Sequence, residues 1–335
     1  LSTDALATVL SHHVVPGRVM STQIPDLADS VAGYTLFFDT SDGVVVSGAS
    51  VTQADIEATN GVVHVIDRVL LPPTVLDAVG LAGLTGLGGA VGAADPAVAA
   101  LLDAPGDLTV LAPTNDAFAA VADVTAGLST QELTDVLTYH VAGSRVTSDA
   151  LPPLAPSLLV NPWGQPVSLL FAGGRVNGVD IVTTDIHTTN GVVHVVDSVL
   201  LPPTVVDHAV AAGLDGLLGA VGAASGDLGT TLSGAGPFTV FAPTNDAFDA
   251  IASTTATLTP DELRDVLLFH VLGGSAPVTS ADLTTGGVPT LLGPNVEVDA
   301  SVPTIGGAGV VTPDIHGTNG TVHVIDSVLL PPAEG

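Results

Sequence analysis

Hydrophobic and polar positions repeat with two different periods along the chain, and these periods separate predicted strands from predicted helices. In "GVVHVVDSVLLPP", apolar residues alternate and β-branched residues dominate, so we expect a strand from Val192 to Leu200. In "LTPDELRDVLLFHV", Leu263, Val266 and Leu267 fall on one face of a helix. Separate blocks of strands and helices indicate the α+β class.

Three segments open with the spacing of a helix start. Thr259 and Glu262 have the spacing of a capping box, in which each residue binds the backbone of the other. Ser129 and Glu132 repeat this pattern, whereas the segment that opens with Ser2 lacks the acid. We therefore expect three equivalent helices.

A third kind of segment, "FTVFAPTNDAF", predicts a short strand, a turn and a second helix start. Pro243 should end the strand, and Thr244 or Asn245 can cap the helix that follows. Asp116 and Asp246 then lie in the first helical turn, where a carboxylate meets the positive end of the helix dipole.

These segments recur with a period of about 130 residues, which is the size of a domain rather than of a solenoid unit. "TNGVVHVVDSVLLPP" has counterparts that begin at Thr59 and Thr318, and the Asn-Gly pair in each predicts a tight turn before the strand. "APTNDAF" occurs twice. Adjacent prolines after each strand stiffen the joints between repeats.

The repeats divide the chain into three predicted domains. Residues 1–73 form the C-terminal half of one domain, residues 74–203 form a second and residues 204–335 a third. The first lacks about 54 residues at its front, including the "APTNDAF" segment. We expect its apolar face to be covered by a missing upstream segment or by a second chain.

Composition excludes several functional classes. There are 34 acidic residues against five arginines and no lysine, which gives a formal charge of −29. Such a surface repels nucleic acid and anionic membranes, and it is suited to a salty or calcium-containing medium. Salt adaptation and drift in a high-GC genome both explain this balance. Without cysteine, the chain has no disulfide, catalytic thiolate or cysteine-ligated metal.

Three elements in fixed order resemble the fasciclin-like domain family: "APTNDAF", a Tyr-His pair after a helix, and "NGVVHVVD" followed by "LLPP". The resemblance covers nearly the whole chain. It implies tandem domains, each a β-sandwich wedge with helices packed on one side. It also implies a secreted or cell-surface protein that acts in adhesion or in an extracellular matrix.

The resemblance also supplies candidate interaction residues. The family's Tyr-His pair corresponds to Tyr139-His140 and Phe269-His270, with His12-His13 as the counterpart in the half repeat. The family's Asp-Ile element, linked with integrin contact in animal members, corresponds to three further pairs. Without lysine or an Arg-Gly-Asp sequence, we do not predict integrin binding. The Asp-Ile pairs are Asp55 with Ile56, Asp185 with Ile186, and Asp314 with Ile315.

The remaining histidines are assigned structural roles. We expect His64, His194 and His323, within the repeated strand, to hold backbone carbonyls through a ring N–H. His187 lies seven residues before His194, which leaves a metal site as the alternative. For His140 and His270, we expect a buried ring that fixes a loop to the core, with an adhesion epitope as the alternative. No catalytic residue, cofactor or metal site is predicted.

Three hypotheses for function follow. The first is a non-enzymatic extracellular or cell-surface adhesion or matrix protein whose partner is a protein or polysaccharide surface. The second is a structural subunit of an extracellular fibre that self-associates end to end, and the third is a small-molecule or polysaccharide binder.

Overall fold

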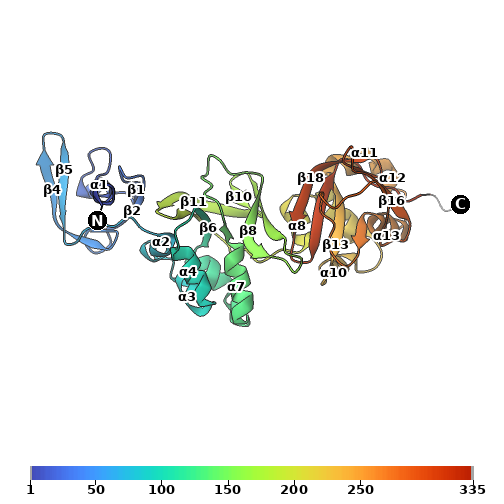
Figure 1. Cartoon of the computed structure of the whole chain (residues 1–335), viewed down its shortest axis with the longest axis horizontal. Helices are drawn as coiled ribbons and strands as arrows, with labels where there is room; N and C mark the ends of the chain where they lie inside the picture. The colour runs from blue at the N-terminus through green and yellow to red at the C-terminus, as the bar shows by residue number, and fades with distance from the viewer. Residues whose placement is uncertain (1, 333–335) are drawn as a thin grey trace. The chain divides into compact units, whose positions relative to one another are not determined.

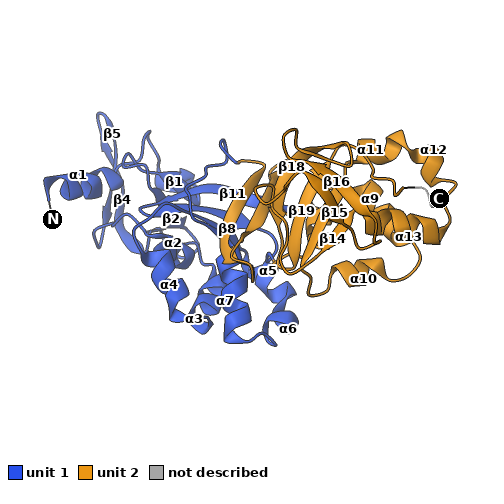
Figure 2. Ribbon diagram, turned by 45° about the vertical axis from the view of Figure 1, so that its right-hand side comes forward, with its two compact units in different colours: residues 1–151, 179–200 blue, residues 152–178, 201–335 orange. Residues whose placement is uncertain are grey.

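The computed structural model describes residues 2–332 and divides into two compact units (Figure 2). The first unit comprises residues 1–151 and 179–200, and the second comprises residues 152–178 and 201–335.

The first unit contains the elements of the opening segment and most of those of the second repeat (Figure 1). Its helices are α1 (Thr3–His12), the 3₁₀ turn η1 (Ser21–Gln23), α2 (Val75–Leu81), α3 (Thr85–Ala93), α4 (Pro96–Asp103), α5 (Asn115–Ala120), α6 (Ala122–Thr125) and α7 (Thr130–Tyr139). Its strands are β1 (Leu27–Asp29), β2 (Thr35–Asp39), β3 (Val45–Val46), β4 (Ala49–Ala58), β5 (Gly61–Ile66), β6 (Leu108–Pro113), β7 (Val141–Ala142), β11 (Val179–Thr188) and β12 (Gly191–Val196).

The second unit contains a hairpin of the second repeat and the whole third repeat. Its helices are α8 (Val205–Ala211), α9 (Asp215–Ala223), α10 (Leu228–Leu232), α11 (Asn245–Ala250), α12 (Ala252–Thr255) and α13 (Pro260–Phe269). Its strands are β8 (Leu154–Val160), β9 (Pro166–Ala172), β10 (Arg175–Val176), β13 (Phe238–Pro243), β14 (Val271–Gly273), β15 (Gly286–Pro289), β16 (Asn295–Asp299), β17 (Thr304–Ile305), β18 (Ala308–His316) and β19 (Gly320–Ile325).

The predicted helix starts are confirmed. Thr259 with Glu262 and Ser129 with Glu132 form reciprocal capping boxes at α13 and α7, and Ser2 caps α1 without an acidic partner. At α5 and α11 the capping side chains are those of Thr114 and Thr244, and Asp116 and Asp246 lie in the first turn.

The third repeat shows how the two periodicities build a domain. Its seven strands follow the order β14-β13-β19-β18-β17-β16-β15, and β13 runs parallel to β19. Alternate residues of β13 pack in two different cores. Phe241 contacts side chains of β16, β17 and β19 inside the folded sheet, whereas Val240 and Ala242 pack against the helices. The predicted α+β class, a β-sandwich with helices on one side, is confirmed.

The repeated strand is central, as predicted, but shorter. β12 lies between β11 and β6, and it ends at Val196 rather than at Leu200. The residues beyond it are held instead by a side chain, because the Leu200 N–H donates to His140 Nε2 at 2.9 Å.

The tight turn before this strand lies one residue earlier than the Asn-Gly pair predicts. Thr188 pairs with Gly191, so Thr189 and Asn190 form the turn. Gly191 is required for another reason: a Cβ there would lie 2.5 Å from the Leu108 carbonyl oxygen of the parallel strand β6. The glycine therefore permits close strand approach rather than a left-handed turn.

The Pro-Pro joints are fixed to the repeats that follow them. The Pro73 carbonyl accepts hydrogen bonds from the Thr189 N–H at 2.8 Å and from its hydroxyl at 3.1 Å. Pro203 has the same two partners in Thr318, at 2.8 and 2.9 Å. Among the described residues, no helix is long and apolar enough to cross a membrane.

Candidate functional site

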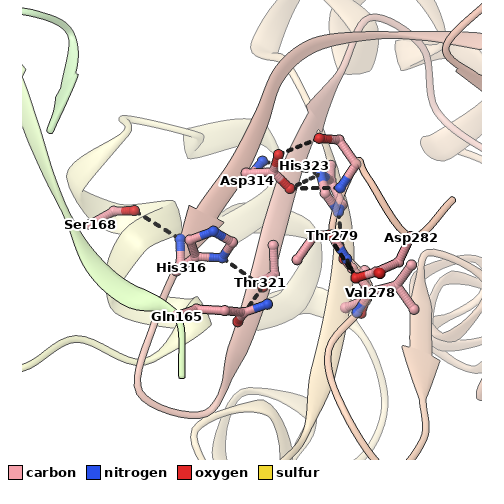
Figure 3. A network of polar contacts seen from close by, with 11 residues as sticks. Gln165, Ser168, Val278, Thr279, Asp282, Asp314, His316, Thr321 and His323 are labelled. Carbon is pink, nitrogen blue, oxygen red and sulfur yellow. Dashed lines mark hydrogen bonds and ion pairs between the residues drawn. The ribbon is translucent and has the colours of Figure 1, made fainter. Parts of the chain in front are cut away.

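The repeated strand histidine is the centre of a buried polar cluster, shown for the third repeat in Figure 3. His323 donates from Nε2 to the Val278 carbonyl at 2.9 Å, and its Nδ1 accepts the Asp314 N–H at 3.2 Å. The Asp314 carboxylate in turn accepts the Ser280 N–H at 2.8 Å and the Ser280 hydroxyl. The ring and carboxylate thus join three segments through backbone groups.

The same cluster occurs in the other two repeats. His194 donates to the Val146 carbonyl at 2.9 Å and accepts from Asp185 at 3.2 Å. His64 makes the corresponding bonds to Val19 and Asp55, at 3.0 and 3.3 Å. This confirms the prediction that these three histidines hold backbone carbonyls.

The aspartate of each cluster has an unusual backbone. Asp55, Asp185 and Asp314 have φ values of 58°, 61° and 60°, in the left-handed region that few non-glycine residues adopt. Each lies where the strand register shifts by a bulge, directly before the isoleucine of the Asp-Ile pair. The bulge turns the aspartate N–H toward the histidine.

Burial and hydrogen bonding shift the pKa values of four of the cluster residues, Asp55, Asp185, His194 and His323. Burial lowers the pKa of His194 and His323, so the neutral rings persist. Partial burial acts to raise the pKa of Asp185, but the hydrogen bonds from Ser148, together with the nearby His194 and His187, hold that pKa below its usual value. The Ser21 hydroxyl and N–H likewise lower the pKa of Asp55.

Serine, aspartate and histidine meet here, but in the wrong order for a hydrolytic triad. The Ser280 hydroxyl donates to Asp314 rather than to His323, and both ring nitrogens of His323 are committed to backbone groups. A triad requires the histidine to accept the serine proton. The cluster therefore has the arrangement of a hydrogen-bond network that holds neighbouring segments together.

The Tyr-His pairs form a second repeated device at the end of a helix. His140 caps α7, donates from Nδ1 to the Val136 carbonyl at 2.7 Å and accepts the Leu200 N–H. His270 makes equivalent bonds to Val266 and Leu329, each at 2.8 Å. Both rings thus fix the segment that leads into a Pro-Pro joint, as predicted for a buried histidine.

The neutral form of these rings is required by their bonding. Each ring accepts an N–H at Nε2, which a protonated histidine cannot do. Burial lowers the pKa of His140 and of His270 to about 4.

The candidate interaction residues differ in how they meet solvent. Most of their side chains are buried and stabilise the fold: Tyr139, His140, Phe269, His270, Ile186 and Ile315. Asp185 and Asp314 are partly exposed, as is Asp55, and Ile56 is 36% exposed. Their role in an interaction stays a prediction.

The sequence profile of the Fasciclin domain family matches residues 1–72, 85–202 and 215–331. The chain belongs to the fasciclin domain family.

Individual relatives support the assignment. Transforming growth factor-beta-induced protein ig-h3 from Sus scrofa is 34% identical over 248 residues, which cover 69% of this chain and 35% of that protein. Human periostin is 27% identical over 316 residues, covering 87% and 35%. The cell surface glycolipoprotein MPB83 of Mycobacterium bovis is 40% identical over 109 residues, covering 31% and 48%. The chain thus spans about a third of the length of ig-h3 and periostin.

A solved structure, titled as a FAS1 domain pair from the insect cell adhesion molecule Fasciclin I, aligns with a TM-score of 0.43 at 20% identity. The alignment covers 74% of this chain and 97% of that one.

Successive fasciclin repeats meet through one recurring hydrogen bond. The His187 N–H donates to the Thr35 hydroxyl at 2.9 Å in the first unit, and the His316 N–H donates to the Ser168 hydroxyl at 2.9 Å in the second (Figure 3). The His316 ring bonds Thr321 at 3.0 Å. The backbone N–H groups of His187 and His316 thus form the repeat contacts, and among the described residues no group of three or more histidine or acidic side chains could hold a metal ion.

The serines of the clusters are site residues that pattern analysis missed. Ser21, Ser148 and Ser280 each end a Val-x-Ser triplet, whose valine supplies the carbonyl and whose serine binds the aspartate. The triplet recurs at the repeat period, so self-comparison of the sequence would have found it. Because the triplet is short and lies in a loop, it shows neither the helix period nor the strand period.

Proposed function

We propose that this chain is a non-enzymatic adhesion or matrix protein of the extracellular space or cell surface, built from tandem fasciclin domains. The observation that carries the proposal is the threefold family match, together with the likeness to ig-h3, periostin and a cell surface glycolipoprotein. The polar clusters support it, because they use their serine, aspartate and histidine groups to fix loops.

The partner in this proposal is a protein or polysaccharide surface. With 34 acidic residues against five arginines, the chain repels nucleic acid and anionic lipid, and it favours partners that are basic or that bind through cations. The Asp55-Ile56 pair of the first repeat is the interaction site that we propose to test, because Ile56 is the exposed isoleucine of the three pairs.

A fibre or other extracellular assembly is the second candidate. The observation that favours it is the recurring hydrogen bond between repeats, from His187 to Thr35 and from His316 to Ser168. Because this hydrogen bond joins successive repeats at two places within one chain, the same surfaces can also join repeats of two different chains. The third candidate, a small-molecule or polysaccharide binder, has less support.

The test is an attachment assay with the full chain on beads, presented to cells, matrix proteins and a polysaccharide panel. We expect saturable attachment that Ile56→Ala reduces. Val182→Ala is the matched control, because Val182 is an exposed apolar residue on the equivalent strand of the next repeat. Attachment to no surface would refute adhesion, and equal loss in both variants would refute the site.

A further inference from the structure

The β8–β9 hairpin of the second repeat packs against the third repeat. Leu154 and Leu170 of the hairpin contact the buried core that contains Val205 of α8. The polar contacts beside them meet the end of β18 and the start of β19: Ser168 with the His316 N–H at 2.9 Å, Gln165 with the Thr321 hydroxyl at 3.5 Å, and Asn161 with the Gly317 carbonyl at 3.1 Å.

A buried histidine of α8 holds the end of β18 that receives this hairpin. His208 is 1% exposed and donates from Nε2 to the His316 carbonyl at 3.0 Å. Its other ring nitrogen, Nδ1, is buried and has no hydrogen-bond partner among the described residues. Because a carbonyl only accepts, Nε2 carries the proton of the neutral ring. A second proton on Nδ1 would therefore be a buried charge and a buried donor without an acceptor.

The junction between the first and second repeats has the same backbone contact but lacks these side chains. There the His187 N–H donates to Thr35, as the His316 N–H does to Ser168. The position of His208 is occupied by Ala78, and that of Thr321 by Val192. Of these two homologous junctions, only the one between the second and third repeats thus contains a buried histidine in α8 or its counterpart α2.

Few charged groups act on the His208 ring. Asp207, its neighbour in α8, favours the charged form of the ring, whereas the His316 ring disfavours it. Burial is the largest effect and keeps the ring neutral. The other titratable groups on elements around α8 either form the hydrogen bonds described above or lie exposed: Asp314, His323 and His270 are bonded, and Asp215 and Asp227 are exposed.

We infer that the junction between the second and third repeats opens in acid when His208 takes up a proton, and that the junction between the first and second repeats does not. Opening the hairpin exposes Leu154 and Leu170 and lets water reach the core around α8. The open state therefore binds the proton more readily than the closed state, so acid favours opening. The inference goes beyond the proposed function and holds whether or not the chain mediates adhesion.

The direction and size of the effect follow from burial. Burial lowers the pKa of His208 to about 4, from 6.5 for a ring in water. The stability of the closed junction is thus fully present above pH 6.5 and is lost as pH falls toward 4. Between pH 7 and pH 5, the equilibrium constant for opening should rise about twentyfold.

Two backbone amides provide a matched readout in the full chain. The His316 N–H is bonded across the second junction and the His187 N–H across the first. Hydrogen exchange resolved by NMR measures the protection factor of each, which corrects for the intrinsic effect of pH on exchange. We expect the protection of His316 to fall about twentyfold from pH 7 to pH 5, and that of His187 to change less than about threefold.

Two variants assign the effect to His208. His208→Gln keeps a donor for the His316 carbonyl but does not titrate, and His208→Ala introduces the residue found at position 78. Circular dichroism at pH 7 verifies that each variant folds. We expect the protection of His316 to lose its pH dependence in both.

Fluorescence gives a second measurement. Trp163 is the only tryptophan and lies in the turn between Asn161 and Gln165, two residues that contact the third repeat. Its emission should shift between pH 7 and pH 5 in the wild type and not in the variants. Wild-type protection of His316 that is unchanged at pH 5 would overturn the inference. An equal loss of protection in either variant, or an equal loss at His187, would also overturn it.

Discussion

At the scale of residues, the aspartate of each polar cluster combines a costly backbone with several hydrogen bonds. A left-handed non-glycine residue costs on the order of 1 kcal/mol, and asparagine and aspartate tolerate it best. Asp185 offsets this cost by accepting two hydrogen bonds from Ser148 and donating one to His194. The same exchange occurs in all three repeats, so the cluster is a unit of the fold.

Substitutions of Asp185 should separate these contributions. Asp185→Asn keeps an acceptor and the backbone tolerance, so we expect the smallest loss of stability. Asp185→Gly removes the strain but also the two hydrogen bonds from Ser148, and Asp185→Ala removes these two bonds while keeping the strain, at a cost of about 1–3 kcal/mol. Urea unfolding measures the series, and an alanine variant as stable as the asparagine variant would contradict this account.

The histidines that end the helices should make stability depend on pH. Burial lowers the pKa of His140 and His270 to about 4, against about 6.5 in an unfolded chain. Between these values the unfolded chain binds protons that the folded chain does not, so stability is lost as pH falls from 6.5 toward 4. The loss is roughly 3 kcal/mol for each ring.

Denaturation at pH 7 and pH 4.5 measures this effect, with His140→Asn as the control. The variant should be less stable at pH 7 because Leu200 loses its acceptor. Its stability should nevertheless change less between the two pH values than that of the wild type. An unchanged difference would show that His140 does not titrate in this window.

At the scale of elements, the parallel pairing of strands decides which repeats have a complete core. β12 and β19 are buried on both faces, whereas the equivalent β5 is exposed at alternate residues. The sequences of the three strands are nearly identical, so their different environments come from neighbours and not from their own residues.

This contrast gives a matched pair of substitutions. Val195 is 8% exposed and Val65, its counterpart, is 41% exposed. Val195→Asp should destabilise its repeat by several kcal/mol, because it leaves an unpaired charge in the core. Val65→Asp should change stability by less than about 1 kcal/mol. Thermal unfolding of both variants checks this, and similar losses would show that the two strands share one environment.

Much of the fold could be predicted from the sequence pattern, and the features that could not be predicted share one physical cause. Capping boxes, helix faces and the central strand depend on local spacing, which the residues near Thr259 or Ser129 display directly. The turn offset at Asn190, the end of β12 at Val196 and the bulge at Asp185 depend on contacts between distant segments. The roles of the Val-x-Ser triplets were hidden for the same reason.

At the scale of the whole molecule, three of the ion pairs that the described residues form add little to stability. The pairs made by Arg18, Arg68 and Arg264 are solvent-exposed, and such pairs contribute little to stability. Stability therefore depends on the apolar cores and on satisfied backbone groups, and it should differ among the repeats as their cores do.

Hydrogen exchange should rank the three repeats. We expect amides of β5 to exchange at least about tenfold faster than those of β12 and β19, because fewer buried contacts oppose local opening. Mass spectrometry of peptides from each strand measures this in one experiment, with the two complete repeats as internal controls. Equal protection in all three strands would show that the first repeat is as stable as the others.

The asparagine that opens each repeated strand also bears on how the protein ages. The side chain of Asn190 is buried, accepts from the Val75 N–H at 2.8 Å and donates to the Leu102 and Ala104 carbonyls at 2.9 Å each. Asn319 is held in the same way, but Asn60 lies exposed in its turn. Each precedes a glycine, the sequence most prone to deamidation, which requires the side-chain amide to reach the next backbone nitrogen.

Asn60 should therefore deamidate during storage at neutral pH while Asn190 and Asn319 remain intact, and peptide mass analysis over time would show the change. Equal conversion at all three positions would contradict this expectation. The hydrogen bonds of Asn190 and Asn319 thus protect the two complete repeats from deamidation. In the first repeat, deamidation of Asn60 adds one negative charge to the molecule as it ages.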